Sequence, residues 1–282
     1  MLRKIKLILG FSTLTIGIVN GQGLHFSQVN NVPLFLSPSN TGLVPDADFR
    51  MGANYRTQWN QVNVNYRTMS AFTDFKFYPS EVSSNWLGVG AGFFSDQAGD
   101  GILSLNQFNL SVAYHINLDH QNMVSVGLGA SYIQRTIDFG RLSYDMQWNG
   151  LVFDKSNSSH ETYRYEKTAY PDFSGGVSYA HMPSEDLYLR AGIGFLHVNR
   201  PKQSFYNNNV NLGLRPTLNL EAVARINDRI ILNPTVYGSF QKKAYEVVFG
   251  SLVSINMLPG DVRSSIFIAG LYYRWNDAVV AL

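Results

Sequence analysis

Hydrophobic and polar residues alternate along most of the chain beyond residue 48. Between 212 and 225, Leu, Pro and Ala occupy one set of alternate positions, and the positions between them carry mainly Gly, Arg, Thr, Asn and Glu. Successive side chains of a β-strand point to opposite faces, so this pattern predicts a strand with one apolar and one polar face. The segments 124–131 and 187–195 alternate in the same way.

The alternation predicts eleven full strands and a short last fragment. The predicted strands are 49–58, 66–78, 86–95, 102–116, 122–137, 170–181, 187–198, 210–226, 230–241, 244–256 and 264–275, followed by the fragment 277–282. Repeated amphipathic segments of this length are typical of an all-β protein, an antiparallel up-and-down β-barrel that spans a membrane. After the N-terminus, no run approaches the roughly 20 apolar residues that a membrane helix needs, which excludes helical membrane proteins.

The connections between the predicted strands fall into two alternating classes. Those expected to be short periplasmic turns are 79–85, 117–121, 182–186, 227–229 and 257–263. Those expected to be extracellular are 59–65, 96–101, 138–169, 199–209 and 242–243. The longest, 138–169, is polar and aromatic and contains Tyr144 and Trp148. It is interpreted either as an external binding loop or as a tolerated surface excursion.

The first residues match a cleavable export signal. Three basic residues precede an apolar stretch at 7–19, and Gly21 lies where a signal peptidase would cleave, so we predict a signal peptide at 1–21. The segment 22–48 is rich in Asn, Pro and Ser and has no periodicity. We expect it to be a periplasmic leader or a plug that enters the barrel, and residues 49–282 to form the barrel in the outer membrane.

Composition and charge exclude several classes of function. Three of the 22 basic residues and none of the 20 acidic residues lie in the predicted signal, which leaves 19 basic and 20 acidic residues and a net charge of −1. This balance gives no basic face for nucleic acid. The sequence contains no cysteine, so disulfides and thiolate metal sites are excluded.

No group of residues in the sequence indicates catalysis, a metal or a cofactor. Asp119 and His120 resemble an acid–base pair, but they fall in a predicted periplasmic turn, whereas a barrel enzyme would act at the outer rim. His115, His181 and His197 lie near predicted strand ends, where a ring at the membrane interface is the ordinary explanation. We therefore expect a protein that is not an enzyme and has no cofactor.

Glycines and aromatic residues recur at characteristic places in the predicted strands. Gly-x-Gly occurs at 88–90, 127–129 and 192–194, inside strands, where glycine eases bending and close approach of other backbone. Aromatic residues near strand ends are expected to form girdles at the two membrane interfaces. The residues concerned include Tyr78, Trp86, Tyr132, Tyr179, Tyr188 and Trp275.

Four charged residues fall on the polar faces of two predicted strands. They are Arg190, Arg215, Glu221 and Arg225. We interpret them either as a selectivity lining of the lumen or as an ion-paired structural network.

Several ordered motifs after the predicted signal resemble one known family. They are Gln22 to Gln28, Pro33 to Pro38, Asn40 to Gly42, Phe49-Arg50, Asn54 to Trp59 and Tyr66 to Thr68 with Asp74, and a weaker match returns at Tyr272 to Ala278. These segments closely resemble the PorP/SprF family of outer-membrane proteins associated with the type IX secretion system and gliding motility. Family members usually continue with further strands, so we expect either that the C-terminus has been lost or that the barrel closes differently. The count of eleven strands and a fragment favours the loss of two or three strands, with about 14 in a complete barrel.

The resemblance implies a role without catalysis. Such a protein would sit in outer-membrane lipid and support the export or surface anchoring of a large secreted adhesin through the adhesin's C-terminal domain. A core-machinery version would instead contact periplasmic ring proteins of the secretion system. A passive diffusion porin or small-ligand channel is the leading alternative, and a surface enzyme is the third.

The expected partner or plug contacts lie in three parts of the chain. They are Phe26, Pro33 and Asn40 in the leader, Arg56, Gln58 and Trp59 in the first hairpin, and Tyr144 and Trp148 in the long loop. The alternative is that the leader and hairpin residues only specify the fold of the barrel's N-terminal seam.

Overall fold

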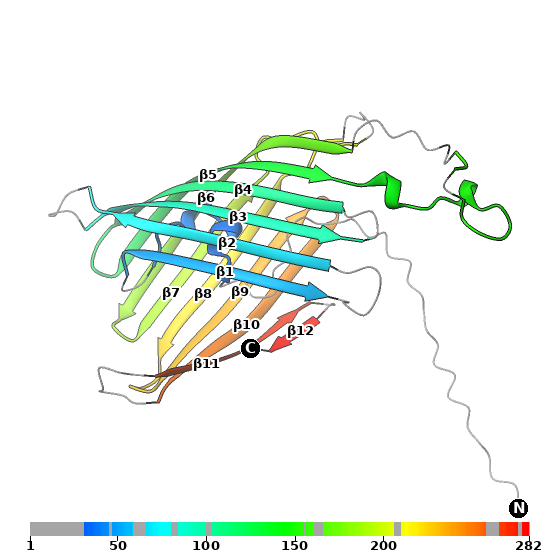
Figure 1. Ribbon diagram of the computed structural model, residues 1–282. Coiled ribbons are helices and arrows are strands. Elements are labelled where there is room, and N and C mark those ends of the chain that lie inside the picture. The colour runs from blue at the N-terminus through cyan, green and yellow to red at the C-terminus, as the bar shows by residue number, and fades with distance from the viewer. Residues whose placement is uncertain are drawn as a thin grey trace, which may run out of the picture.

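A computed structural model describes residues 31–44, 47–58, 66–79, 84–99, 103–154, 156–158, 160, 166–205, 210–257, 265–275 and 278–281. These residues form one antiparallel sheet of 12 strands, in which each strand pairs with its neighbours in sequence. The sheet curves strongly around a central space (Figure 1). The predicted signal peptide at 1–21 lies outside the described residues.

The strands are β1 (Phe49–Gln58), β2 (Tyr66–Phe77), β3 (Trp86–Ala98), β4 (Leu103–Asn117), β5 (Asn122–Thr136), β6 (Lys167–Ser184), β7 (Leu187–Leu196), β8 (Arg215–Arg225), β9 (Ile230–Gln241), β10 (Ala244–Asn256), β11 (Ile266–Arg274) and β12 (Ala278–Ala281). The helical elements are α1 (Pro33–Leu36) and η2 (Pro38–Asn40) before β1, and η3 (Phe139–Arg141) and η4 (Asp145–Gln147) between β5 and β6. None of the helices in the described ranges is long and apolar enough to cross a bilayer.

The predicted antiparallel up-and-down architecture is confirmed, and most strand bounds agree within three residues. The largest difference is at β8, which begins at Arg215 and not at 210. Residues just before it pair with the preceding loop instead, because Leu212 N donates to Pro201 O at 2.9 Å and Lys202 bridges to Asn211. Local alternation in that segment therefore does not reflect pairing within the sheet.

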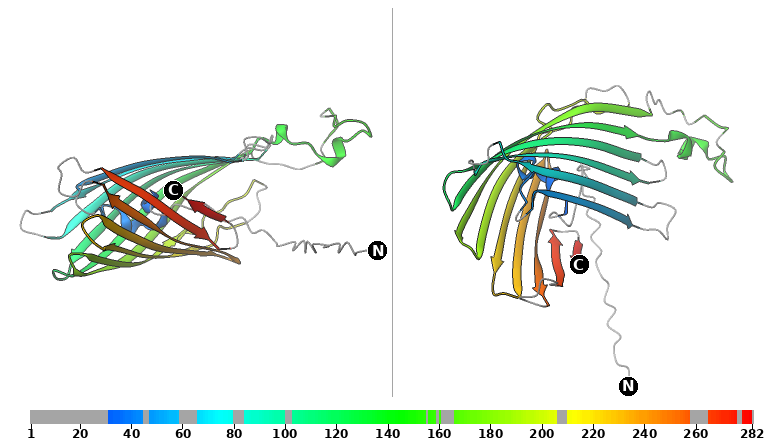
Figure 2. Two further views of the ribbon diagram at one scale, coloured as in Figure 1. Left: turned by 90° about the horizontal axis from the view of Figure 1, so that it is seen from below. Right: turned by 60° about the vertical axis from the view of Figure 1, so that its left-hand side comes forward.

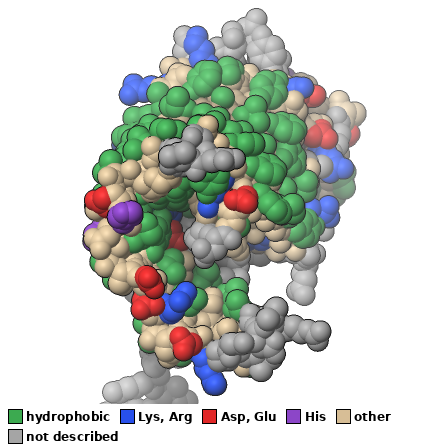
Figure 3. Space-filling model, turned by 90° about the vertical axis from the view of Figure 1, so that its left-hand side faces the viewer, with side chains coloured by type: hydrophobic (Ala, Val, Ile, Leu, Met, Phe, Trp, Pro, Cys, Tyr) green, Lys and Arg blue, Asp and Glu red, His purple; other side chains and the backbone are tan. Residues whose placement is uncertain are grey.

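The two faces of the sheet differ as the alternation predicts. On β5, Val126 and Leu128 are exposed, whereas Ser125 and Gly127 are buried. On β8, Leu218 is exposed and Thr217 is buried. In Figure 3 hydrophobic side chains form a broad continuous area, and most charged side chains lie toward its margins. An apolar outer surface of this kind suits contact with lipid.

The core lies on the concave side of the sheet and is built around α1. Val32 and Leu34 pack there with residues of β2, β3, β9, β10 and β11. Phe35 meets Phe94 of β3 edge to face, with ring centroids 6.2 Å apart. The sheet therefore buries apolar side chains inside its curve as well as presenting them outside.

The outermost strands of the sheet are β1 and β12, and within the described residues no backbone pairs join them. The views in Figure 2 show the two strands on opposite margins of the curved sheet. The expectation of further strands stays a prediction.

Candidate functional site

Residues 31–44, here called the inner segment, lie inside the curved sheet (Figure 2). The side chains of Ser37, Ser39 and Thr41 are 0% exposed although all three are polar. A buried polar segment without regular pairing must find its hydrogen-bond partners in the surrounding wall. The contacts between the inner segment and the surrounding wall therefore define a candidate site.

Glycines of the wall make room for the inner segment. A Cβ added at Gly88 of β3 would collide with the carbonyl oxygen of Thr41, and one at Gly127 of β5 would collide with the backbone of Pro38. Both glycines belong to the Gly-x-Gly patterns of the sequence. The predicted close approach of other backbone at these positions is confirmed, and the approaching backbone is that of the inner segment.

Side chains of the wall satisfy the carbonyl groups of the inner segment. The indole N–H of Trp86 donates to Gly42 O at 3.0 Å, and the hydroxyl of Thr217 donates to Leu36 O at 3.0 Å. Nε2 of His115 lies 2.8 Å from Thr41 O. These three donors come from β3, β8 and β4, so the segment is held from several sides of the curved sheet.

The expectation that His115 lies at the membrane interface was wrong. His115 is 0% exposed, and its ring stacks on that of Trp86 with centroids 4.7 Å apart. Trp86 and Tyr188 likewise do not belong to an interfacial girdle, because their positions in β3 and β7 lie on the inward face of the sheet. The other aromatic residues predicted for the girdles are exposed: Tyr78, Tyr132, Tyr179 and Trp275.

An ion pair ties the first hairpin of the sheet to the inner segment. Arg50 of β1 and Asp74 of β2 stand opposite each other in the register, and Nη2 of Arg50 lies 2.7 Å from Oδ2 of Asp74. The same oxygen accepts the N–H of Gly42 at 2.7 Å, and Nη2 of Arg50 also donates to Asn40 O at 3.3 Å. Sequence reasoning did not identify this pair as a site, although both residues fall on the polar face of predicted neighbouring strands.

Two of the predicted lumen charges meet the inner segment. Nη2 of Arg190 lies 2.6 Å from Oε2 of Glu221, and Nη1 of Arg190 donates to the amide oxygen of Asn40. Asn40 also donates from Nδ2 to Pro33 O at 3.0 Å. The structure therefore brings together Asn40, Arg190 and Glu221, which sequence analysis had singled out for separate reasons.

The other two predicted lumen charges lie apart from this group. Arg215 is buried and lies 3.5 Å from Glu246 of β10. The side chain of Arg225 is 56% exposed and lies 4.0 Å from Asp186 in the turn between β6 and β7, so it belongs to the end of the sheet and not to the interior network.

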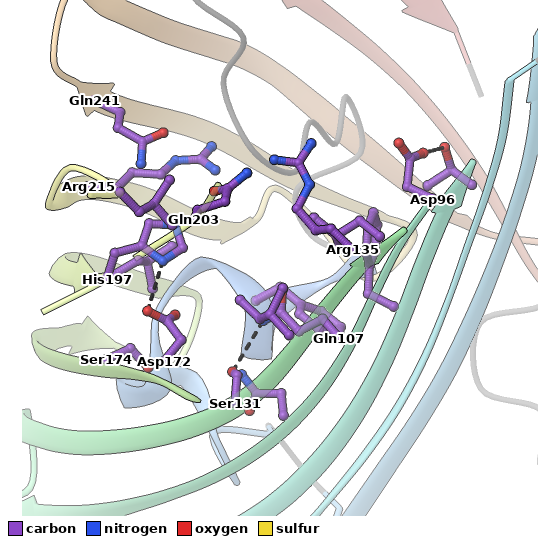
Figure 4. A pocket seen from close by; sticks show the side chains of 18 of the residues that line it. Asp96, Gln107, Ser131, Arg135, Asp172, Ser174, His197, Gln203, Arg215 and Gln241 are labelled. Carbon is purple, nitrogen blue, oxygen red and sulfur yellow. Dashed lines mark hydrogen bonds and ion pairs between the residues drawn. The ribbon is translucent and has the colours of Figure 1, made fainter. Parts of the chain in front are cut away.

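A cavity of about 500 Å³ lies between the inner segment and the end of the sheet that carries the β5–β6 connection, here called the outer end. Its floor is Leu34, Phe35 and Leu36, and its walls come from β1 to β9 (Figure 4). Arg56 and Gln58, two of the predicted contact residues, line it.

The remaining predicted contacts are dispersed. Pro33 is buried in α1, whereas Phe26 and Trp59 lie outside the described residues. Tyr144 is half-buried beside η4, and Trp148 is exposed and forms an isolated β-bridge with Phe153. The two loop residues are therefore on a different surface from the interior site.

Asp119 has a structural role in the turn between β4 and β5. Its Oδ1 accepts the N–H groups of Gln121 and Asn122, each at 2.7 Å, and both carboxylate oxygens accept from the side chain of Asn122. These hydrogen bonds, above all the one from the Asn122 side chain, lower the pKa of Asp119 from its ordinary value. Among the described residues, no cluster of three His, Asp or Glu residues could hold a metal ion.

Comparison with known proteins gives one family and a general fold. The family model described as "Type IX secretion system membrane protein PorP/SprF" matches residues 18–282. The structure resembles that of the toluene transporter TbuX of Ralstonia pickettii, with 11% sequence identity, a TM-score of 0.51, and coverage of 89% of this chain and 83% of that chain.

A more distant likeness is to the β domain of the Bordetella autotransporter BrkA, with 11% identity, a TM-score of 0.44, and coverage of 83% of this chain and 93% of that chain. No curated protein matches the sequence. At 11% identity, the likeness to TbuX concerns the outer-membrane β-barrel fold alone.

Proposed function

Because the chain belongs to the type IX secretion system membrane protein PorP/SprF family, we propose that it supports the export or surface anchoring of a large secreted adhesin by binding the adhesin's C-terminal domain. The family match over residues 18–282 carries this proposal. Family and fold place the protein in the outer membrane as a β-barrel component of the secretion system. The finer role, in adhesion or gliding motility, is part of the proposal.

The filled interior favours docking of the cargo over passage of the cargo through this barrel. Val32, Ser37 and Thr41 are fully buried in the middle of the curved sheet. A folded protein domain is about 34 Å across, since a domain of roughly 100 residues has a radius of gyration of about 13 Å, which corresponds to a sphere of about 17 Å radius. Such a cargo could not share the interior with the inner segment, so we propose that it binds at the outer end.

The connection between β5 and β6 offers an external surface for such a cargo. Trp148 and Phe153 pair as an isolated bridge with ring centroids 5.0 Å apart, and Leu151 between them is 85% exposed. Met146 and Val152 beside them are also exposed. Contiguous exposed apolar side chains on a loop favour contact with a protein partner. We define Met146, Trp148, Leu151, Val152 and Phe153 as the loop patch.

Affinity purification of the tagged protein from its native envelope, followed by mass spectrometry, tests the proposal. A variant with Trp148→Ala and Leu151→Ser is compared with Leu118→Ala, which changes an exposed apolar residue in a turn at the opposite end of the sheet. We expect a large surface protein to copurify with the parent and the control, and to be lost from the loop variant. If periplasmic ring proteins copurify with the parent and are lost from the Leu118→Ala variant, the chain instead belongs to the core machinery.

A small-ligand channel is the second candidate, and the cavity of about 500 Å³ at the outer end favours it. The likeness to a toluene transporter extends to the fold and carries no ligand to this chain. A protein that copurifies with no partner and conducts ions steadily in planar bilayers would support the channel and overturn the docking role.

A further inference from the structure

The outer cavity combines an apolar floor with polar walls. Phe35 and Phe94 meet edge to face at its base, with ring centroids 6.2 Å apart, and Ile133 adds an apolar side chain from β5. Asn109 and Ser131 contribute buried polar groups from β4 and β5. Cavities of roughly 300 to 1,000 Å³ with an apolar lining and a few placed polar groups are typical of small-molecule sites.

Basic groups outnumber acidic groups in the cavity lining. Arginines at 56, 135 and 215 line it, together with only two carboxylates, Asp96 and Asp172. Oδ1 of Asp96 accepts the hydroxyl of Thr68 at 2.6 Å. Oδ1 of Asp172 lies 3.0 Å from Nδ1 of His197 (Figure 4), but the two atoms do not form a hydrogen bond. Each acidic group of the lining therefore lies beside a polar side chain of the same lining, Thr68 or His197.

Arg135 differs from the other charged groups of the cavity. It follows Ser131 and Ile133 on the inward face of β5, and its side chain projects into the cavity in Figure 4. Its Nε is buried without a hydrogen-bond partner, and within the described residues its guanidinium forms neither an ion pair nor a hydrogen bond. Oδ1 of Asn109, deeper in the same cavity, also lacks a partner among those residues. Arg135 as a whole is half-buried, so its guanidinium faces the cavity and is available to an anionic ligand.

We propose that this cavity binds a small organic carboxylate with an apolar body. Arg135 binds the carboxylate, because a guanidinium fork matches its two oxygens. The apolar body packs toward Phe35 and Phe94, and the amide oxygen of Asn109 accepts a donor of the ligand where one is present. This site is independent of the proposed docking role, since its residues lie inside the sheet and not on the loop patch.

Calorimetric titration of the full chain in detergent micelles tests the site, with phenylbutyrate as the probe and phenylbutyramide as its neutral counterpart. We expect the acid to bind about tenfold more tightly than the amide, as the loss of a charge-assisted hydrogen bond predicts. Arg135→Gln removes this preference, and Arg135→Lys retains part of it. The matched control is Arg67→Gln, because Arg67 lies near the same end of the sheet but on its exposed outer face. This substitution should leave the preference for the acid unchanged.

Heat-dependent migration in gels shows that each variant retains the folded barrel before titration. Equal affinity for acid and amide in the parent overturns the proposal, as does a preference that survives Arg135→Gln or disappears with Arg67→Gln. Absence of measurable binding of the acid to the folded parent overturns it as well.

Discussion

Arg50 and Asp74 form a two-point ion pair that also holds the inner segment. Nε of Arg50 donates to Oδ1 of Asp74 at 3.1 Å, and Nη2 lies 2.7 Å from Oδ2, which in turn accepts the N–H of Gly42. Asp74 is 0% exposed and the side chain of Arg50 is 26% exposed. One carboxylate therefore joins β1, β2 and the inner segment.

Asp74→Ala should destabilise the barrel, because it leaves the guanidinium of Arg50 and the N–H of Gly42 without their acceptor. Breaking a buried ion pair costs about 3 to 5 kcal/mol, and the partial exposure of Arg50 reduces the expected loss to about 2 to 3 kcal/mol. Urea unfolding of the protein in detergent micelles measures the change. The control is Asp138→Ala, whose partner Arg141 is exposed, with an expected loss below about 1 kcal/mol. Equal losses for the two variants would contradict the buried role of Asp74.

Gly88→Ala should displace the inner segment, because the new Cβ would collide with the carbonyl oxygen of Thr41, which is a backbone atom and cannot rotate away as a side chain could. The sequence has no cysteine, so Ser39→Cys, at a buried position, provides a single reporter for maleimide labelling. A loss of about 1.4 kcal/mol in local stability makes labelling about tenfold faster.

Gly175→Ala is the matched control for that experiment. A Cβ at Gly175 would have its nearest neighbour 3.9 Å away, at Gly127 O. Labelling of the reporter should therefore stay at the parent rate in this variant. Unchanged labelling with Gly88→Ala would show that the segment is not held against β3 as the structure describes.

The strands were predictable because alternation reports directly which face of a sheet is apolar, and β9 and β10 agree with their predicted bounds at both ends. The interior site was predictable only in part: Asn40, Arg190 and Glu221 were singled out from the sequence, but their contacts with one another were not. The pairing of Arg50 with Asp74 depends on the register between strands, which alternation within one strand does not contain. His115 was assigned to the interface because the position of a histidine near a strand end does not show whether its ring faces lipid or, as here, the carbonyl of Thr41. The inner segment has no periodicity, so nothing in its own pattern indicated its partners.

The turn between β4 and β5 should lose stability in acid. Hydrogen bonds lower the pKa of Asp119 below its ordinary value of 3.8, so the carboxylate stabilises the folded state fully above pH 3.8. That contribution is lost as the pH falls through the lowered pKa. The difference in urea midpoint between the parent and Asp119→Asn should therefore be constant above pH 3.8 and should shrink below it.

Asn122→Ala provides the control for the turn, because the Asn122 side chain donates to both carboxylate oxygens and is the main cause of the lowered pKa. In this background the pH at which the Asp119 contribution disappears should move upward, toward 3.8. An unchanged pH profile would show that the side chain of Asn122 does not hold the carboxylate in solution.

Removal of the inner segment should turn the barrel into an ion-conducting pore. Residues 33–41 are buried at every position, and their deletion would leave Arg190, Glu221 and Asn219 facing water in place of protein. A polar lumen filled with water conducts ions. We expect single-channel steps in planar bilayers for the deletion variant and only rare openings for the parent. Deletion of 149–152 in the connection between β5 and β6 is the control, because it shortens an outer connection without touching the interior, and it should behave like the parent. Equal conductance of parent and deletion variant would mean that the inner segment does not block the lumen, and the docking role would lose its argument from the filled interior.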